Sequence, residues 1–237
     1  MAVTRLASQP AADTPPPHIV QALTAALLAG DRPCAERLIM RLTGYGPPAE
    51  QAERALYLLA AVARHMGGLW DEDRITAADA ILAAHLMNEI ARDGQPTAAW
   101  GRPPAAGRVA LCTVPGETHS LGLRLVSARL GRAGWPCSLY VGLDEGALVA
   151  ELVARGYRLI GLSIACQRCL PALAELTRAI RRAIPAAFLF VGGVLVDRMR
   201  AAVSALDCDA VVDGQTDLEA LLQDTRAGRE SPALGAP

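Results

Sequence analysis

Three short groups of residues that could form a binding site each follow a predicted β-strand. The first, Glu117–Gly122, reads ETHSLG and places a carboxylate two residues before a histidine. The second, Ser163–Ala165, offers a small hydroxyl, and the third is the pair Gly192–Gly193, which lacks Cβ atoms and lets a ligand pass close to the backbone. A lone loop histidine or a lone Gly-Gly turn would indicate little. Their coincidence after three separate strands predicts one ligand site.

The second half of the chain alternates strand and helix patterns, which would bring these groups together. The expected strands are 108–114, 138–141, 159–165, 187–191 and 210–212, and the expected helices are 121–130, 145–154, 171–183, 197–206 and 216–226. Five such units predict an α/β fold: a Rossmann-like (flavodoxin-like), doubly wound parallel sheet of five strands. Ligands of such sheets lie beyond the carboxyl ends of the strands, at the switch point.

The first half of the chain has apolar residues at helical spacing. Four helices are expected, at about 19–29, 31–42, 48–66 and 76–92, with Gly67-Gly68 ending the third and Thr76 capping the fourth. They predict a small four-helix-bundle cap. The full division is a disordered N-terminus at 1–16, the helical cap at 17–93, a linker at 94–107, the Rossmann-like domain at 108–228 and a disordered tail at 229–237.

Composition narrows the class of protein. The net charge is −1, and all 23 basic residues are arginine without forming a basic stripe, so direct nucleic acid binding is not expected. No apolar run reaches the length of a membrane span, and the first residues do not read as a signal peptide. Six scattered cysteines suit a reducing compartment, so a cytoplasmic location is expected.

The three groups together resemble the DxHxxG…SxL…GG signature of cobalamin (vitamin B12)-binding domains, with Glu117 in place of Asp and Ala165 in place of Leu. The resemblance implies that the cofactor's dimethylbenzimidazole base leaves cobalt and enters the domain, and that His119 becomes the metal ligand. Neutral imidazole suits cobalt, and Glu117 could hold the other ring nitrogen. The cofactor-binding residues implied are Glu117, Thr118, His119, Ser120, Gly122, Ser163, Ala165, Gly192, Gly193, Gly214 and Trp70.

Residues 68–79, 115–135 and 159–163 resemble the AerR/PpaA group of B12-binding antirepressors, and the likeness extends over about residues 20–225. The more distant CarH-type photoreceptors share Trp70, but Asp71, Ala80 and Ile81 replace their histidine and their Glu-His pair. The resemblance implies a non-enzymatic regulator that binds a protein partner such as a transcription repressor and that responds to light. His65 and His85 are the remaining candidates for an upper cobalt ligand, although each suits a helix surface equally.

Two questions stay open at this point. Cys166 and Cys169 form a CxxC that could be a redox pair, but the segment belongs to the cobalamin signature and lacks a thioredoxin context, which favours two incidental thiols. The main alternative function is a corrinoid carrier that brings methyl groups to a methyltransferase. A mutase subunit is disfavoured because this chain contains no pattern for a substrate barrel.

Overall fold

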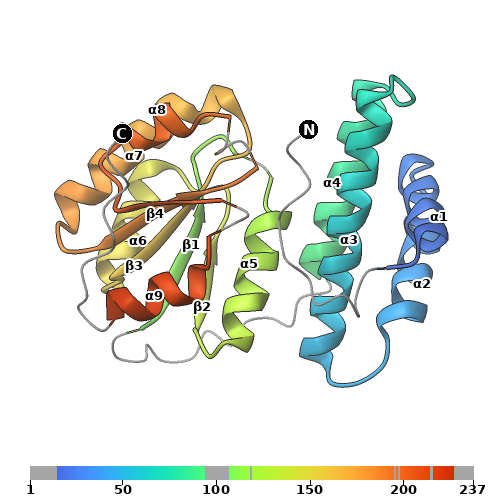
Figure 1. Ribbon diagram of the computed structural model, residues 1–237, viewed down its shortest axis with the longest axis horizontal. Helices are drawn as coiled ribbons and strands as arrows, with labels where there is room; N and C mark the ends of the chain where they lie inside the picture. The colour runs from blue at the N-terminus through green and yellow to red at the C-terminus, as the bar shows by residue number, and fades with distance from the viewer. Residues whose placement is uncertain are drawn as a thin grey trace. The chain divides into compact units, whose positions relative to one another are not determined.

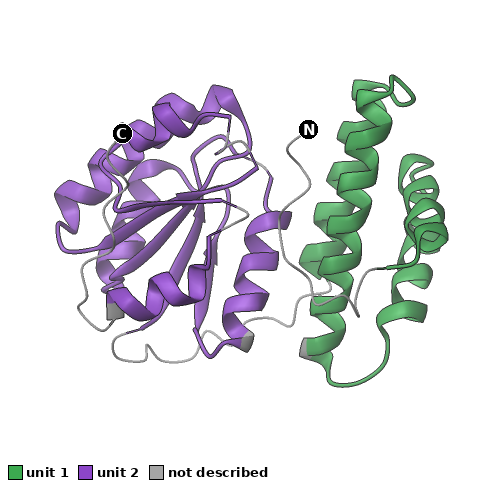
Figure 2. Ribbon diagram, in the orientation of Figure 1, with its two compact units in different colours: residues 1–99 green, residues 100–237 purple. Residues whose placement is uncertain are grey.

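The computed structural model describes residues 15–93, 107–117, 119–194, 196, 198–213 and 216–226 (Figure 1). The chain divides into two compact units, residues 1–99 and 100–237, which are coloured separately in Figure 2. Most of the predicted N-terminal segment 1–16 and of the linker 94–107, and all of the tail 229–237, lie outside the described residues. Within the described part of the chain, no helix is both long and apolar enough to cross a membrane.

Unit 1 contains the four expected helices: α1 (Pro17–Leu28), α2 (Arg32–Thr43), α3 (Pro48–Asp71) and α4 (Ala77–Asp93). Asp31 caps α2 by accepting a hydrogen bond from the Cys34 N–H at 3.0 Å. Thr76 and Asp79 form the predicted cap of α4, in which each side chain accepts a hydrogen bond from the other residue's backbone N–H. The prediction that Thr76 begins the fourth helix is therefore confirmed.

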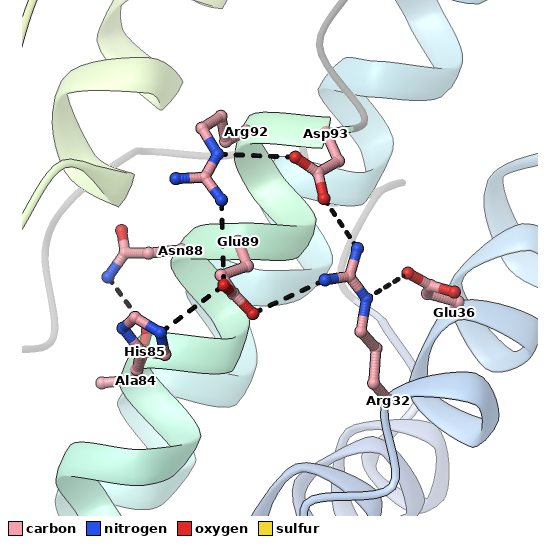
Figure 3. Close-up of polar contacts among 8 residues, drawn as sticks. All are labelled: Arg32, Glu36, Ala84, His85, Asn88, Glu89, Arg92 and Asp93. Carbon is pink, nitrogen blue, oxygen red and sulfur yellow. Dashed lines mark hydrogen bonds and ion pairs between the residues drawn. The ribbon is translucent and has the colours of Figure 1, made fainter.

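Apolar residues from the four helices form the core of unit 1, and a polar network joins the start of α2 to the end of α4. Fully buried members of the core include Leu23, Leu27, Leu56, Leu59, Val62 and Ala83. Arg32, at the start of α2, donates to Glu36 and to Asp93 at 2.7 Å each and to Glu89 at 3.5 Å (Figure 3). These side chains are partly exposed, so each pair adds little stability, but together they join the start of α2 to the end of α4.

The prediction that Gly67-Gly68 ends the third helix is wrong, because α3 continues to Asp71. Glycine in a helix costs only about 1 kcal/mol relative to alanine, so two glycines weaken the helix without breaking it. The helix ends where Asp73 adopts a left-handed φ of 56°. There the N–H of Asp73 donates to the Trp70 carbonyl and the N–H of Arg74 to the Leu69 carbonyl, the two bonds of a Schellman motif.

Unit 2 is the predicted five-stranded, wholly parallel sheet. Its strands are β1 (Val109–Thr113), β2 (Cys137–Tyr140), β3 (Leu159–Ser163), β4 (Phe188–Gly192) and β5 (Ala210–Val212), in the order β2-β1-β3-β4-β5. This is the flavodoxin-like order, in which the chain reverses its direction of winding between β1 and β3. The fold class predicted from the sequence is therefore confirmed.

Helices cover both faces of this sheet. The helices α6 (Glu145–Ala154), α7 (Leu170–Ala183) and α8 (Arg200–Ser204) pack on one face, and α5 (Leu121–Arg132) and α9 (Leu218–Arg226) pack on the other. Several expected boundaries in this unit shift by one to three residues, among them those of α8, which was expected at 197–206, and two others bear on the site. Strand β3 ends at Ser163 rather than at 165, and a 3₁₀ turn (Gln167–Cys169) precedes α7. The apolar residues of this segment therefore continue past the end of strand pairing, because Ile164 and Ala165 already belong to the loop.

Replacing Gly68 with alanine tests the continuous α3 helix. Outside the backbone of α3 itself, no described atom lies within 4 Å of a Cβ placed at Gly68, so alanine adds helix propensity without a clash. The free energy of unfolding should rise by about 0.5–1 kcal/mol. Thermal unfolding followed by circular dichroism at 222 nm measures the change.

Gly30→Ala is the matched control, since Gly30 is equally free of neighbours but has a φ of +69°. That substitution should lower stability by roughly 1–2 kcal/mol. If Gly68→Ala destabilised the protein as Gly30→Ala does, the chain at Gly68 would be a turn and not a helix.

Candidate functional site

The carboxyl ends of three neighbouring strands place small side chains in one row. Thr113, Ser163 and Gly192 are register partners across β1, β3 and β4. Side chains alternate along a strand, and register neighbours point to the same side. Val109 and Leu111 belong to the core on the α5/α9 face, so Thr113 and its partners share that face. The predicted Ser163 and Gly192 thus meet at the switch point, as a ligand site at this edge requires.

Glu117 lies in the loop after β1 and connects two loops of the site. Its side chain is only 1% exposed, and its Oε1 accepts the backbone N–H of His119 at 2.9 Å. Its Oε2 accepts the N–H of Ala165, in the loop after β3, also at 2.9 Å. The buried carboxylate therefore has a donor for each oxygen and holds the first two predicted groups together.

The ring of His119 completes this arrangement. Its Nδ1 lies 2.5 Å from Glu117 Oε1, while the side chain as a whole is 56% exposed. A carboxylate can only accept a hydrogen bond, so Nδ1 carries the hydrogen, and in the neutral imidazole Nε2 keeps the free lone pair. An exposed imidazole in a fixed orientation, with its second nitrogen held by a carboxylate, has the form of a metal-ligating histidine.

The pKa of Glu117 supports the ionised form that this pairing needs. Burial by itself raises the pKa of the carboxyl group. Hydrogen bonds from the His119 N–H, the His119 ring and the Ala165 N–H outweigh that effect and hold the pKa of Glu117 below its usual value. The carboxylate is thus an acceptor at neutral pH.

Helix α5 begins immediately after this pair. Ser120 precedes its first residue and is buried, whereas Gly122 is exposed near the start of the helix. No described atom lies within 4 Å of a Cβ placed at Gly122, so protein packing does not require glycine at this position. Thr118 lies outside the described residues.

The two glycines after β4 differ in what surrounds them. A Cβ at Gly192 would lie 3.2 Å from the Val212 carbonyl oxygen, a tight approach. Gly193 has a φ of +131°, and its Cβ would lie 2.0 Å from the Ile164 carbonyl oxygen. Contact between two backbone segments therefore accounts for Gly193, so a bulky residue there would disturb the fold whether or not a ligand passes nearby.

Sequence reasoning missed two positions in this part of the sheet. Thr113 is buried, stands beside Ser163, and its Oγ1 accepts the N–H of Gly142 at 3.1 Å. Gly161 lies beneath the Phe190 ring, where a Cβ would come within 2.4 Å of Cζ. A hydroxyl and a glycine within otherwise apolar strands were the available signals.

Three other predicted residues belong to unit 1, and one lies outside the described residues. Trp70 belongs to unit 1, in the last turn of α3, and is 46% exposed, so it is not a core residue of the bundle. His85 is exposed on α4, with Nε2 3.5 Å from Glu89. His65 is partly exposed on α3. Gly214 lies outside the described residues.

Comparison with known proteins agrees with this geometry. A family model described as a B12 binding domain matches residues 107–222. Among solved structures, the monomethylamine corrinoid protein of Methanosarcina barkeri is 17% identical, and the alignment covers 83% of this chain and 92% of that chain with a TM-score of 0.61. No curated protein sequence matches the chain.

Two other structures are similar at lower TM-scores. The methanol:cobalamin methyltransferase complex of Methanosarcina barkeri is 15% identical, with 83% of its chain and 92% of this chain covered at a TM-score of 0.49. A cobalamin-binding protein of Desulfitobacterium hafniense is also 15% identical, with 97% of its chain and 88% of this chain covered at 0.44.

The described residues fit the cofactor named by these matches. His119 offers a free Nε2, the space at Gly122 is open to a close neighbour, and Thr113, Ser163 and Gly192 form a row of small side chains. The flat macrocycle of cobalamin would lie over the loops and need the histidine and the open space. Its nucleotide tail would lie along the sheet and need the small side chains. Cobalamin, with its cobalt, is therefore the cofactor of this domain.

A pair of glycine substitutions separates packing from ligand contact. Gly193→Val should lower the free energy of unfolding of the apoprotein by about 1–3 kcal/mol or more, because its side chain overlaps the Ile164 carbonyl. Gly122→Ala should leave the apoprotein at least as stable as the wild type, since Gly122 lies in α5, yet weaken cobalamin binding measurably. Thermal unfolding of the apoprotein and cobalamin titration measure the two effects. A Gly122→Ala variant with unchanged cobalamin affinity would place the corrin away from the start of α5.

Proposed function

We propose that this protein, whose residues 107–222 form a B12-binding domain with cobalamin as its cofactor, is a cobalamin-dependent regulator that reports the state of the cofactor to a protein partner. The observation that carries the proposal is the pairing of buried Glu117 with the exposed ring of His119. Such a pair supports a lower axial ligand for cobalt and requires no catalytic group from the chain.

His119 would hold cobalt through Nε2, with Glu117 fixing the tautomer and the ring plane. The hydroxyl of Ser163 and the backbone at Gly192 would meet the displaced nucleotide tail on the α5/α9 face. Bound cobalamin supplies a cobalt centre whose upper axial group can be exchanged or lost to light. The role of the chain is to hold that centre in one orientation and to keep one of its faces covered.

Unit 1 supplies the features of a reporting surface. Trp70 lies in the last turn of α3, and Ile81 and Leu82 lie just beyond the short loop, near the start of α4; all three are exposed. Large apolar side chains gathered at one end of a helical unit are typical of a surface that contacts a ligand or a partner. The likeness of residues 68–79 to the AerR/PpaA group supports a transcription repressor as that partner.

The upper axial group should be small in this protein. Asp71, Ala80 and Ile81 occupy the positions at which CarH-type photoreceptors carry a histidine and a Glu-His pair. Without those residues, recognition of an adenosyl group and a second histidine ligand are not expected from the same positions. Water or hydroxide after photolysis is the ligand that this chain suits best.

A corrinoid methyl carrier is the second candidate. It is favoured by the fold likeness to the monomethylamine corrinoid protein, which extends over 83% of this chain and includes both units. In that case the partner would be a methyltransferase.

Replacing His119 tests the cobalt ligand. His119→Ala should abolish binding of hydroxocobalamin or leave it with the absorption spectrum of a base-on or water-ligated form. Glu117→Gln keeps the size of the side chain but removes the charge, and should weaken binding roughly 10–100-fold, as is usual for partners of metal-ligating histidines. Absorption titration measures both. His18→Ala, at an exposed position in the first turn of α1, is the control that should bind normally. A normal spectrum and affinity in His119→Ala would overturn the assignment.

Hydrogen exchange distinguishes the regulator from the carrier. In a regulator, amides at the α3–α4 end should exchange at different rates in the apo-, adenosyl- and hydroxocobalamin forms, and light should convert the adenosyl pattern to the hydroxo pattern. Trp70→Ala should remove the difference, while Tyr45→Ala, at another exposed aromatic of unit 1, should preserve it. Identical exchange in all forms, with methyl transfer from the methylcobalamin form to a thiol acceptor, would instead establish the carrier.

A further inference from the structure

Cys166 and Cys169 lie beside the Glu117–His119 pair but take no part in the role proposed for it. Cys166 directly follows Ala165, whose N–H donates to Glu117 Oε2 at 2.9 Å. Cys169 is the last residue of the 3₁₀ turn and is 4% exposed, whereas Cys166 is partly exposed. Both are free thiols. The pair therefore has one thiol that solvent reaches and one that the core covers.

The turn between the two cysteines suits a disulfide. The N–H of Cys169 donates to the Cys166 carbonyl at 3.0 Å, so the four residues form a closed turn. The Cα atoms at the ends of such a turn lie within about 7 Å, and disulfides usually join Cα atoms about 4.4–6.8 Å apart. Closing an S–S bond across this turn therefore needs the two side chains to rotate toward each other and the turn to tighten.

The Glu117 carboxylate lies near enough to act electrostatically on the buried thiol. Burial raises the pKa of Cys169, and the Glu117 carboxylate and Cys166 raise it further. Cys169 is therefore kept as a thiol, and Cys166, the more exposed of the two, is the group that a dissolved oxidant meets first. The geometric link between the turn and the carboxylate is the Ala165 N–H, which donates to Glu117 Oε2 directly before Cys166.

We propose that Cys166 and Cys169 are a redox-active dithiol, which a peroxide converts to an intramolecular disulfide, and that this disulfide weakens the hydrogen bond from Ala165 to Glu117. The weakened hydrogen bond would lower cobalamin affinity only if His119 is the cobalt ligand, so this part rests on the proposed function. The first half does not depend on cobalamin.

The chemistry balances with peroxide as the only co-reactant. The Cys166 sulfur attacks one peroxide oxygen, the O–O bond breaks, and a sulfenic acid and one water result. The Cys169 sulfur then attacks the Cys166 sulfur, the S–O bond breaks, and a second water leaves with the proton of Cys169. Two thiols are oxidised by two electrons, and one peroxide is reduced to two waters.

The disulfide would act on the site through one residue of backbone. Closing the S–S bond draws Cys166 toward the start of α7, and Ala165 is attached to it directly. Among the described residues, the Ala165 N–H is the donor to Glu117 Oε2, while Oε1 accepts from His119. Displacing Ala165 would release the carboxylate from the β3 loop and change the orientation that it gives the imidazole.

The chain offers a direct assay for the disulfide. Arg168 lies between the two cysteines, so trypsin separates them into peptides 159–168 and 169–178. Apoprotein treated with hydrogen peroxide, alkylated and digested without reductant should yield these two peptides joined, and reductant should release them. Cys169→Ser should abolish the joined species, while Cys208→Ser, which alters another partly exposed thiol, should preserve it. Two alkylated peptides, or Cys166 overoxidised without a link, would overturn the dithiol.

The coupling has its own readout in the apoprotein. Hydrogen exchange of the Ala165 amide, followed by nuclear magnetic resonance, should become roughly tenfold faster in the oxidised protein, because a hydrogen bond to a charged group is lost. After removal of peroxide, hydroxocobalamin should bind roughly threefold to tenfold more weakly, less than the loss expected when a histidine's partner is removed. Cys166→Ser should show neither change. A disulfide with an unchanged Ala165 amide would overturn the coupling. A changed amide with unchanged cobalamin binding would count against His119 as the ligand and leave the dithiol intact.

Discussion

The arrangement of the site depends on one buried carboxylate. Glu117 is taken out of water, which is costly for an ionised group unless donors replace the lost hydration. The His119 N–H, the His119 ring and the Ala165 N–H supply that replacement and come from two different loops. The same bonds that stabilise the charge also fix the tautomer of His119. Glutamate, with one more methylene than aspartate, still reaches both loops from this position.

The sheet decides what stands beside that carboxylate. Parallel pairing places the ends of β1, β3 and β4 in register, so Thr113, Ser163 and Gly192 become neighbours although they are far apart in the chain. Close packing sets further limits nearby. The Phe190 ring covers Gly161, and the backbone of Gly193 lies against Ile164. Small residues at this edge therefore do two things. They let one backbone segment contact another, and they leave space along the ends of the strands.

Unit 1 follows a separate set of constraints. Its core is aliphatic, its helix ends are capped by Asp31 and by the Thr76–Asp79 pair, and the Arg32 network joins two of its ends. The exposed large apolar residues of this unit include Trp70 in the last turn of α3 and Ile81 and Leu82 near the start of α4. The core and caps account for the folding of the unit without them, and in the proposed function these residues are available for contact with a partner.

The sequence by itself determined the elements and the residues of the candidate site. Apolar periodicity is a local property, so the alternation of strands and helices after residue 107 predicted the five-stranded sheet, and glutamate two residues before histidine predicted the Glu117–His119 pairing. Local pattern failed at Gly67-Gly68, because a helix already formed on both sides tolerates glycine, and the left-handed Asp73 that ends it has no distinctive signal. Only the tertiary structure decided three contacts. The Ala165 N–H donates to Glu117, the backbone of Gly193 packs against Ile164, and Thr113 is the register partner of Ser163. Each of these is a contact between segments far apart in the chain, and its geometry arises only when the strands pair.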